Sequence, residues 1–378
     1  MRKKTTPEIE NNLTALREKR GLPAAQLARL VNVTRQTIYA MEANDYVPNT
    51  ALALKLARVL DVRVEDLFIL PGETQPPELR TAHAIPLAGT PDPYPGQSVQ
   101  LCQVDKRLLA STPSPVPWYF PLGDAVVSEE PAKEGRLNVK ILQAGKEFTN
   151  RILIAGCDPG ISILARHVQA AGVELVLAHR NSSQSLELLK QGSIHIAGTH
   201  LRDDASGESN IPEIGRKFTR RSVAVISFAV WEEGIVTARG NPKHLKSIED
   251  FARPDVSIVN RETGAGTRKV LDAHLKRLGL PGSRVRGYDR TAEGHLAGAW
   301  QVMSGQVDAC IATHAAARML GLGFVPLVSE RYDLAIHRHH LDLPAIQTLL
   351  ETLSRSSFRR ELESLGGYDT TAAGQRLL

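Results

Sequence analysis

Half of the prolines in this chain fall within one short stretch, and they limit what the chain can fold into. Eleven of the 22 prolines lie between Pro71 and Pro121. Because proline lacks a backbone N–H and breaks helices, part of this stretch is expected to be a semi-rigid extended linker. Two runs within it, Ser98–Val104 and Leu137–Leu142, have the composition of strands, but no function follows from them. We therefore assign three parts: a first domain at 1–70, a proline-rich linker with a small β-containing connector at 71–149, and a second domain at 150–378.

The composition is that of a globular protein without a membrane span. Hydrophobic residues make up 42% of the 378 residues, and the net charge of +5 is compatible with polyanion binding without establishing it. The cysteines Cys102, Cys157 and Cys310 are far apart and form no CxxC pair, so neither a disulfide framework nor a structural zinc site is expected. The polar N-terminus and the lack of a long apolar run predict a cytoplasmic protein.

Helix signals dominate the first domain. Gly21 is a C-terminal stop, and Pro23 sits at a helix start, where its missing N–H costs nothing. Asn32 suits a tight left-handed turn, and the Thr34 side chain is placed to cap the helix that follows it. The predicted helices are Ile9–Lys19, Ala24–Leu30, Arg35–Met41, Thr50–Leu60 and Glu65–Phe68.

The helix, tight turn and helix over Pro23–Met41 have the form of a DNA-reading unit. A short turn fixes the two helices so that the second one enters the major groove. Arginine and glutamine at the start of that helix are able to read base edges, while threonine and tyrosine hydroxyls hold phosphates. The candidate DNA-binding residues are Thr34, Arg35, Gln36, Thr37, Tyr39 and Asn44.

Several motifs in this domain resemble the xenobiotic-response-element family, the Cro-type helix-turn-helix regulators. They are Leu16–Leu22, Leu27–Ala28, Val33–Ile38, Met41–Glu42, Tyr46–Asn49 and Asp66–Phe68. The resemblance covers 9–69 and implies a homodimer that binds a pseudo-palindromic double-stranded DNA operator. It also implies a bacterial or archaeal protein that is associated with the nucleoid when bound to DNA. This chain departs from the family at Pro23-Ala24, where Ser-Gln is usual, which puts one phosphate contact in doubt. The alternative interpretation is a helical bundle used only for dimerisation.

The second domain alternates apolar strands with amphipathic helices, which is typical of an α/β fold. Strands are predicted at Ile152–Gly156, Val173–Ala178 and Ile194–Ala197, each followed by a polar turn. Ligands of open parallel sheets bind at the carboxyl ends of strands, where loops meet helix N-termini. This topology places the following residues in a cleft: Cys157, Asp158, Ser182, Ser183, Thr199 and His200.

A glycine-rich loop follows a further strand at Val256–Val259. Its glycines allow close approach of backbone amides to an anion, and Arg261 and Arg268 add paired charge if both face inward. Glu262 is interpreted as an ion-pair partner of Arg261. The run His337–His340 is interpreted as a solvated loop and not as a metal site. The remaining candidate ligand-binding residues are Arg261, Thr263, Gly264, Ala265, Gly266, Thr267, Arg268, His295, Thr313 and Tyr332.

The second domain resembles the periplasmic-binding-protein-like (type II) domain related to bacterial molybdate-binding proteins. The motifs are Ala155–Pro159, Ser185–Leu189, Gly192–His200, Gly240–Pro242, Asn260–Glu262, Gly264–Arg268, Glu330–Leu334 and Gly367–Asp369. The resemblance implies two lobes, one at about 150–225 and 323–378 and the other at about 226–322, that close around a ligand. Ser222–Val230 and Phe324–Val328 are the expected crossing strands. Ala265 departs from the family, in which serine is common.

Together the two resemblances predict a multidomain transcription regulator whose cleft binds a small anion, molybdate or tungstate, and modulates operator binding. A small organic anion or a molybdenum-cofactor-related molecule is an alternative ligand. A further alternative is a DNA-binding protein whose second domain binds a protein partner. An enzyme is not expected, because the sequence contains no GxSxG, HExxH or kinase-type motif. No cofactor, bound metal or membrane partner is expected either.

Overall fold

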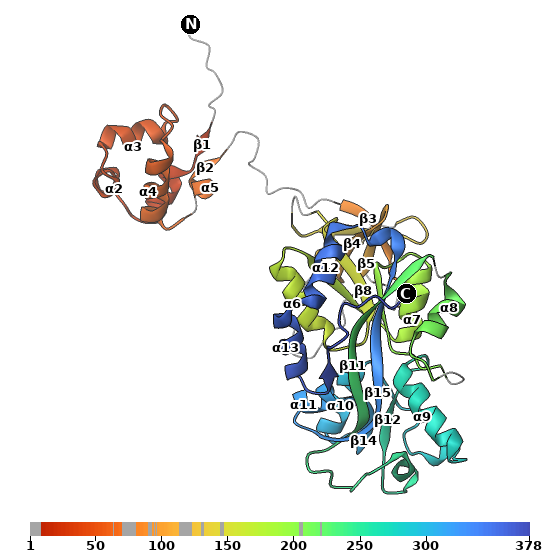
Figure 1. Cartoon of the computed structure of the whole chain (residues 1–378). Coiled ribbons are helices and arrows are strands. Elements are labelled where there is room, and N and C mark those ends of the chain that lie inside the picture. The colour runs from red at the N-terminus through yellow and green to blue at the C-terminus, as the bar shows by residue number, and fades with distance from the viewer. Residues whose placement is uncertain are drawn as a thin grey trace. The chain divides into compact units, whose positions relative to one another are not determined.

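The computed structural model divides the chain into two compact units, Met1–Arg80 and Thr81–Leu378 (Figure 1). Each unit is described by itself below. In the part of the chain that the structure describes, every helix is too short or too polar to cross a membrane. The described residues are 9–62, 64–69, 81–89, 93, 95, 97–112, 123–129, 132–143, 147–203, 207–219 and 221–378.

The first unit is a bundle of short helices held together by a small β-ribbon. Its helices are α1 (Leu13–Lys19), α2 (Ala24–Val31), α3 (Arg35–Glu42), α4 (Thr50–Leu60) and α5 (Val64–Leu67). β1 (Glu10–Asn11) pairs antiparallel with β2 (Phe68–Ile69). Two predicted boundaries are therefore wrong: the first helix does not begin at Ile9, and Phe68 belongs to a strand. Both boundaries are set by the pairing of β1 with β2, which joins the two ends of the domain. Helical periodicity in the sequence gives no sign of such pairing.

The turn between α2 and α3 is formed by Asn32 and Thr34, as expected. Asn32 is left-handed, with φ 60° and ψ 53°. The Thr34 side chain caps α3 by accepting a hydrogen bond from the Thr37 amide at 3.1 Å. Beneath this turn, Leu27, Ile38 and other apolar side chains form one buried cluster, which fixes the angle between the two helices.

A shielded ion pair joins the first helix to the third. Arg17 Nε donates to Glu42 Oε1 at 2.6 Å, and the two side chains are only 12% and 10% exposed. Arg17 also donates to the Leu22 carbonyl at 3.0 Å. Loss of one partner leaves the other charge poorly solvated, which costs more than loss of an exposed pair.

We expect Glu42→Ala to lower the free energy of unfolding of the first unit by about 2 kcal/mol. Glu18→Ala is the matched control, because Glu18 is 66% exposed and lies 3.6 Å from Arg17. Far-ultraviolet circular dichroism reports the helices of both units, whereas all three tryptophans of the chain follow residue 80 and report the second unit. A transition seen by circular dichroism without a matching change in tryptophan fluorescence is therefore assigned to the first unit. Equal losses for the two variants would contradict the structural role given to Glu42.

The second unit begins with a closed five-stranded barrel. Its strands are β3 (Thr81–Pro86), β4 (Ser98–Val104), β5 (Arg107–Ser111), β6 (Ala125–Val127) and β7 (Leu137–Ile141), in the order β3-β5-β4-β6-β7. Val99, Leu101, Val139 and neighbouring apolar residues fill its interior. The segment expected to be linker and connector thus contains a complete barrel from Thr81 onward. The extended linker predicted for the proline-rich runs at 71–80 and 113–121 lies outside the described residues.

A nine-stranded sheet organises the rest of this unit (Figure 1). Along the sheet the order is β13-β12-β14-β11-β15-β10-β8-β9, and β16 also pairs with β11. Lobe one contains β8 (Arg151–Gly156), β9 (Glu174–His179) and β10 (Ile196–Thr199). Lobe two contains β12 (Ile258–Arg261), β13 (Thr291–Ala292) and β14 (Ala309–Thr313). The shared strands are β11 (Val223–Thr237), β15 (Gly323–His337) and β16 (Tyr368–Asp369).

The two long strands β11 and β15 pair antiparallel from one lobe into the other. Each has 15 residues, so the predicted crossing strands Ser222–Val230 and Phe324–Val328 lie in the correct places but are too short. The polar residues Glu233 on β11 and Glu330 on β15 interrupted the apolar pattern from which the limits were predicted. Both carboxylates lie where the strands pass between the lobes.

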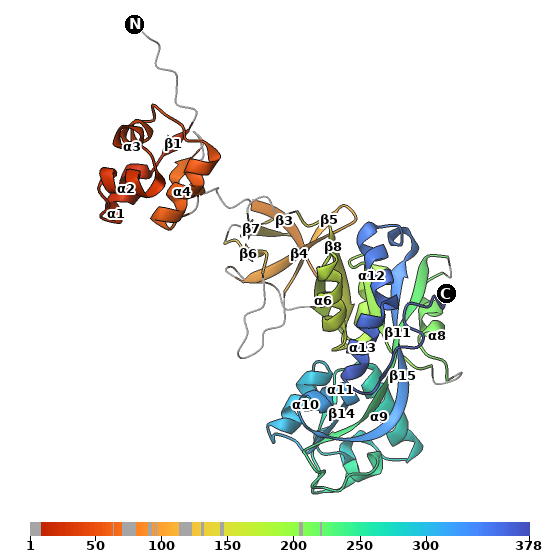
Figure 2. The same cartoon turned by 60° about the vertical axis from the view of Figure 1, so that its left-hand side comes forward.

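Helices cover the lobes (Figure 2). Those packed on lobe one are α6 (Ile161–Ala170), α7 (Ser182–Lys190), α8 (Ile211–Lys217), α12 (Pro344–Ser354) and α13 (Ser356–Ser364). Those of lobe two are α9 (Gly266–Arg277), α10 (His295–Met303) and α11 (His314–Met319). Short 3-10 helices occupy Ile248–Ala252, Gly282–Arg284 and Arg338–His340. Contacts of α6 with α12 and α13 join the C-terminal helices to lobe one.

Polar contacts attach the barrel to lobe one. Arg151, the first residue of β8, donates to Asp124 and to the Leu101 carbonyl of the barrel, and to Glu174 of the neighbouring strand. His340 bonds to Asp105 of the barrel at 3.0 Å and is only 2% exposed. The prediction of a solvated loop is therefore wrong for His340, because the barrel covers it.

Candidate functional site

The start of α3 presents a polar face to solvent. Thr34, Arg35 and Gln36 are exposed, and the Tyr39 side chain is 44% exposed one turn later. The Arg35 guanidinium donates to the Tyr39 hydroxyl at 2.9 and 2.6 Å and lies 5.0 Å from the centre of its ring. The two side chains therefore hold each other in place on the surface of the helix. This face offers fixed donors of the kind that read bases or bind phosphates.

The other two predicted residues of this surface have local structural contacts. Thr37 is half-buried, and its hydroxyl lies 2.8 Å from that of Thr34. Asn44 follows α3 with φ 59° and accepts a hydrogen bond from Asn11 at 2.5 Å. Asn44 thus ties the end of α3 to the β-ribbon as well as lying exposed beside it.

In the second unit the two lobes contact each other through the segments Asn181–Ser183 and Thr263–Gly266, which we call the rim. Asn181 and Ser183 of lobe one donate to the carbonyls of Thr263 and Gly264 of lobe two, at 3.3 and 3.0 Å. Gly264 has φ +93°, and a Cβ on Gly266 would lie 2.3 Å from the carbonyl oxygen of His200. Glycine is therefore required where the lobes meet, because a side chain would occupy the space that the opposite lobe fills.

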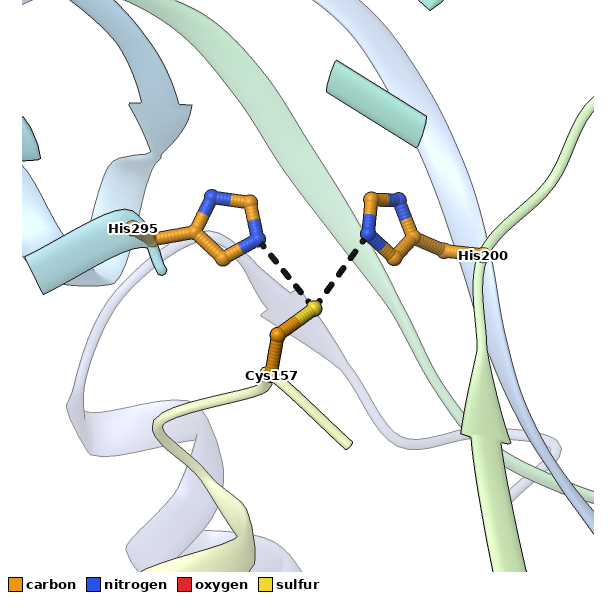
Figure 3. A group of neighbouring side chains, drawn as sticks. All are labelled: Cys157, His200 and His295. Atoms are coloured by element: carbon orange, nitrogen blue, oxygen red, sulfur yellow. Dashed lines mark hydrogen bonds between the residues drawn. The ribbon is translucent and has the colours of Figure 1, made fainter. Parts of the chain in front are cut away.

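Three buried side chains converge between the lobes. Cys157 follows β8, His200 follows β10, and His295 begins α10 of lobe two. Both imidazoles turn Nε2 toward the cysteine sulfur, at 3.5 Å for His200 and 3.9 Å for His295 (Figure 3). Each of the three is 1% exposed. Lobe one therefore supplies two members of this cluster and lobe two supplies the third.

Two carboxylates lie on the Nδ1 side of the imidazoles, away from the cysteine sulfur. His200 Nδ1 lies 2.8 Å from Glu330 Oε2, and His295 Nδ1 lies 3.9 Å from Glu233 Oε1. Glu233 also accepts a hydrogen bond from the Thr267 hydroxyl at 2.5 Å, and its other oxygen is buried with no partner among the described residues. The two carboxylates are 5% and 0% exposed.

These contacts set the charges of the cluster. Burial alone would lower the pKa of His200, but Cys157 and Glu330 raise it well above its usual value. Burial, with a smaller contribution from the nearby Arg261, holds the pKa of His295 well below its usual value. Burial and the neighbouring Glu330 raise the pKa of Glu233 to about 7.

A small pocket of about 40 Å³ opens beside the cluster, again between the lobes. Arg180 of lobe one and Arg261 of lobe two both line it, together with the carboxylates Glu262 and Glu293. Arg261 forms a two-bond ion pair with Glu262, at 2.9 Å for each bond, as predicted. Arg180 Nε and Arg261 Nη1 are buried, and within the described chain neither has a hydrogen-bond partner.

Burial affects these two arginines differently. Burial lowers the pKa of Arg180 below its usual value, and the nearby Glu293 opposes this only in part. Burial also acts on Arg261, but the bond to Glu262 and the nearby Cys157 hold its pKa above its usual value. An anion that reached both free nitrogens would relieve the desolvation of the two cations.

A larger groove lies on another side of the lobe interface. Its volume is about 410 Å³, and Arg202 and Asp203 of lobe one face Lys269 and Arg277 of α9 across it. Glu330, the partner of His200, also lines this groove. The groove therefore reaches the residues behind the buried cluster.

Known proteins match both units. A family model described as a PBP superfamily domain matches residues 165–354, half of the chain, and a helix-turn-helix family model matches residues 13–67. The uncharacterized protein YvgK of Bacillus subtilis (strain 168) is 32% identical over 266 residues, which cover 67% of this chain and 86% of YvgK. The chain therefore belongs to the family of proteins that contain a PBP superfamily domain. Its first unit is a helix-turn-helix domain.

Two further comparisons concern the separate domains. The uncharacterized HTH-type transcriptional regulator YgzD of Bacillus subtilis (strain 168) is 40% identical to this chain over 65 residues, which cover 17% of this chain and 98% of YgzD. The sulfate-binding protein SubI from Mycobacterium tuberculosis H37Rv overlays on 58% of this chain and 86% of its own, with a TM-score of 0.43 and 15% identity. The expected fold class, a helical domain joined to a two-lobed α/β domain, is confirmed. The relation to molybdate-binding proteins stays a prediction.

The structure gathers most of the cleft residues predicted in the PBP superfamily domain at the lobe interface. They are Cys157, Ser182, Ser183, His200, Arg261, Thr263, Gly264, Ala265, Gly266, Thr267, His295 and Tyr332. Ser182 accepts a hydrogen bond from the His200 amide at 3.0 Å, and Tyr332 accepts one from the Cys157 amide at 3.3 Å. Their roles toward a ligand stay predictions.

The other four predicted residues have structural partners within their own lobe, and their roles toward a ligand also stay predictions. Thr199 bonds to Asn210, and Thr313 caps α11 by accepting a hydrogen bond from the Ala316 amide. Asp158 accepts hydrogen bonds from Gly160 and Tyr368, both at 2.6 Å, and burial raises its pKa to about 7. The Arg268 guanidinium lies 4.7 Å from the centre of the Tyr288 ring and donates to the Arg261 carbonyl at 3.1 Å.

The sequence analysis missed Arg180, Glu233 and Glu330 as members of the site. A signal for Glu233 was present, because Glu232 and Glu233 follow closely on the apolar run predicted as the strand Ser222–Val230, and apolar residues resume at Ile235. A charged residue in such a strand needs a partner and often marks a functional position. Arg180 directly follows β9, in the same turn as Ser182 and Ser183, which were predicted to lie in the cleft.

Proposed function

We propose that this chain is a ligand-responsive transcription regulator: α3 binds a DNA operator, and a small ligand bound between the lobes modulates that binding. The observation that supports the DNA-reading role is the exposed Arg35–Gln36 pair at the capped start of α3, with Arg35 held by Tyr39. Relatives of such domains bind as dimers to half-sites about 34 Å apart. We therefore expect a homodimer on a pseudo-palindromic operator.

Arg35→Ala and Gln36→Ala should each reduce the preference for operator over random DNA by at least about tenfold, since a base-reading contact contributes about 1–3 kcal/mol. Arg58→Ala is the control, because Arg58 is an exposed arginine in the last turn of α4. Operator sites are first selected from a random library with the wild-type chain, and affinities are then measured by fluorescence anisotropy. Unchanged preference in both α3 variants would show that another surface reads the DNA.

For the ligand, we propose a small oxyanion such as molybdate or tungstate in the pocket between Arg180 and Arg261. The observation that supports it is the pair of buried, unpartnered guanidinium nitrogens, one from each lobe, described above. An anion bridging them favours the closed lobes over the open ones, and this difference in affinity is what transmits a signal. The volume of about 40 Å³ suits an inorganic ion and not a larger organic molecule.

Calorimetric titration with molybdate, tungstate, sulfate and phosphate tests this ligand. Heat that is specific to molybdate and tungstate, and at least about tenfold weaker binding in Arg180→Met, would support it. Arg253→Met is the matched control, because Arg253 is 38% exposed, pairs with Asp255 and is not among the residues that line the pocket. Absence of heat with all four anions would exclude an oxyanion sensor and leave the DNA-binding proposal in place.

A small organic anion is the second candidate ligand, and the larger groove favours it. Its volume of about 410 Å³ lies in the range of organic ligand sites, and Arg202, Lys269 and Arg277 supply positive charge. A thermal-shift screen of anionic metabolites distinguishes the two, with Lys269→Ala weakening an organic ligand and not an oxyanion. No shift with any compound would favour a protein partner for this domain.

A further inference from the structure

The Cys157–His200–His295 cluster offers a ligand set that neither the anion pocket nor the lobe contacts explain. A cysteine sulfur and two imidazole nitrogens face one another with no solvent exposure above 1%. All three ligand atoms lie within 4.8 Å of one another. A buried core would gain more from apolar side chains at these positions, since buried polar groups cost free energy unless they are bonded.

The spacing fits a single ion at the centre. Zinc–sulfur and zinc–imidazole bonds of about 2.3 and 2.05 Å place the sulfur about 3.6–3.8 Å from each nitrogen for tetrahedral to trigonal angles. The observed sulfur-to-nitrogen distances are 3.5 Å for His200 and 3.9 Å for His295. Both rings already aim Nε2 at the sulfur, so a bound ion needs no change of rotamer (Figure 3).

The carboxylates complete the pattern of a metal centre. Histidines that bind metals present one nitrogen to the ion and the other to a carboxylate, which orients the ring and increases its basicity. Here Glu330 lies 2.8 Å from Nδ1 of His200, and Glu233 lies 3.9 Å from Nδ1 of His295. His200 thus has the carboxylate contact of a metal-binding imidazole, whereas His295 Nδ1, at 3.9 Å from Glu233, has no hydrogen-bond partner among the described residues.

We propose that Cys157, His200 and His295 bind one late first-row transition-metal ion of the Zn²⁺ or Cu⁺ class. A thiolate with two imidazoles selects borderline and soft ions and disfavours Mg²⁺ or Ca²⁺, which prefer oxygen ligands. Because two ligands belong to lobe one and His295 to lobe two, the ion fastens the lobes in the closed form. This inference rests on the proposed function only in treating lobe closure as the signal.

The test uses the untagged full-length chain, stripped of metal by a chelator and dialysed against Zn²⁺ or Co²⁺. We expect one tightly bound ion per chain and, with Co²⁺, a thiolate-to-cobalt charge-transfer band. Cys157→Ser should abolish the band and weaken Zn²⁺ binding at least about a hundredfold, while Glu330→Gln should weaken it about 10–100-fold. The Cys102→Ser/Cys310→Ser double variant is the control, since both of those cysteines are also free and buried.

Defined outcomes would overturn the proposal. One is the absence of a charge-transfer band in the wild-type chain, a readout that does not depend on any variant folding. Another is binding that survives Cys157→Ser but falls with His339→Ala, which would place the ion at Asp105, His339 and His340 instead. Metal binding and molybdate binding are measured separately. Molybdate binding without metal binding would contradict the metal site and leave the oxyanion proposal in place. Metal binding without molybdate binding would contradict the oxyanion proposal and leave the metal site in place.

Discussion

Replacing Gly266 with alanine will hold the two lobes apart without unfolding either of them. A Cβ at this position would lie 2.3 Å from the carbonyl oxygen of His200 and 2.6 Å from Cε1 of its ring, across the lobe interface. The backbone of Gly266 is not in the left-handed region, and the residue opens α9. Alanine therefore fits the helix itself, in which it is more favourable than glycine by up to about 1 kcal/mol. The clash arises only on closure.

The expected consequence is at least about tenfold weaker binding of any ligand that requires closed lobes. Hydrogen–deuterium exchange measured by mass spectrometry should increase in the peptides that contain Asn181–Ser183 and Thr263–Gly266, and barrel peptides should not change. Gly215→Ala is the control, because a Cβ on Gly215 meets nothing within 4 Å. Unchanged exchange at the rim in Gly266→Ala would mean that the two lobes do not meet there in solution.

The second large effect is expected at Arg151, which joins the barrel to lobe one. Its guanidinium is 8% exposed and bonds to both oxygens of Asp124, at 2.5 and 3.0 Å, and to the Leu101 carbonyl at 2.5 Å. Arg151→Met leaves Asp124, which is 5% exposed, without its countercharge. Breaking a buried pair in this way costs about 3–5 kcal/mol. We expect a loss of that size in the free energy of unfolding of the second unit.

Denaturant unfolding followed by tryptophan fluorescence measures this loss. In the Arg151→Met/Asp124→Leu double variant part of the stability should return, because no charge is then left buried alone, although the Leu101 amide and carbonyl lose these partners. Arg253→Met is the matched control on an exposed pair with Asp255, whose side chains are 38% and 49% exposed, and we expect it to change stability little. Equal effects of Arg151→Met and Arg253→Met would show that Arg151 does not hold the barrel on lobe one.

Features that depend on a few neighbouring residues could be predicted from the sequence. Asn32 in the turn and Thr34 at the start of α3 are examples, because each acts on backbone groups within three residues. Likewise, the strand–turn–helix repeats of lobe one placed Cys157 and His200 at strand ends, since parallel strands share one edge.

Features that depend on distant pairing could not be predicted. The barrel closes through β3 and β7, whose short strands are separated by β4, β5, β6 and proline-rich loops. His295 lies 95 positions beyond His200 in the chain, so only the crossing strands bring the two imidazoles to one sulfur. Their carboxylate partners Glu330 and Glu233 lie on those same long strands, and the apolar pattern around them gave no indication of what they would face.

The central claim is that occupancy of the lobe interface changes the affinity of the helix-turn-helix domain for DNA. The most direct measurement is the affinity of the full-length chain for its selected operator by fluorescence anisotropy, with and without the ion or anion found to bind. We predict a change of at least about fivefold for the wild-type chain and none for Gly266→Ala. The same operator affinity with and without saturating ligand in the wild-type chain would contradict the claim.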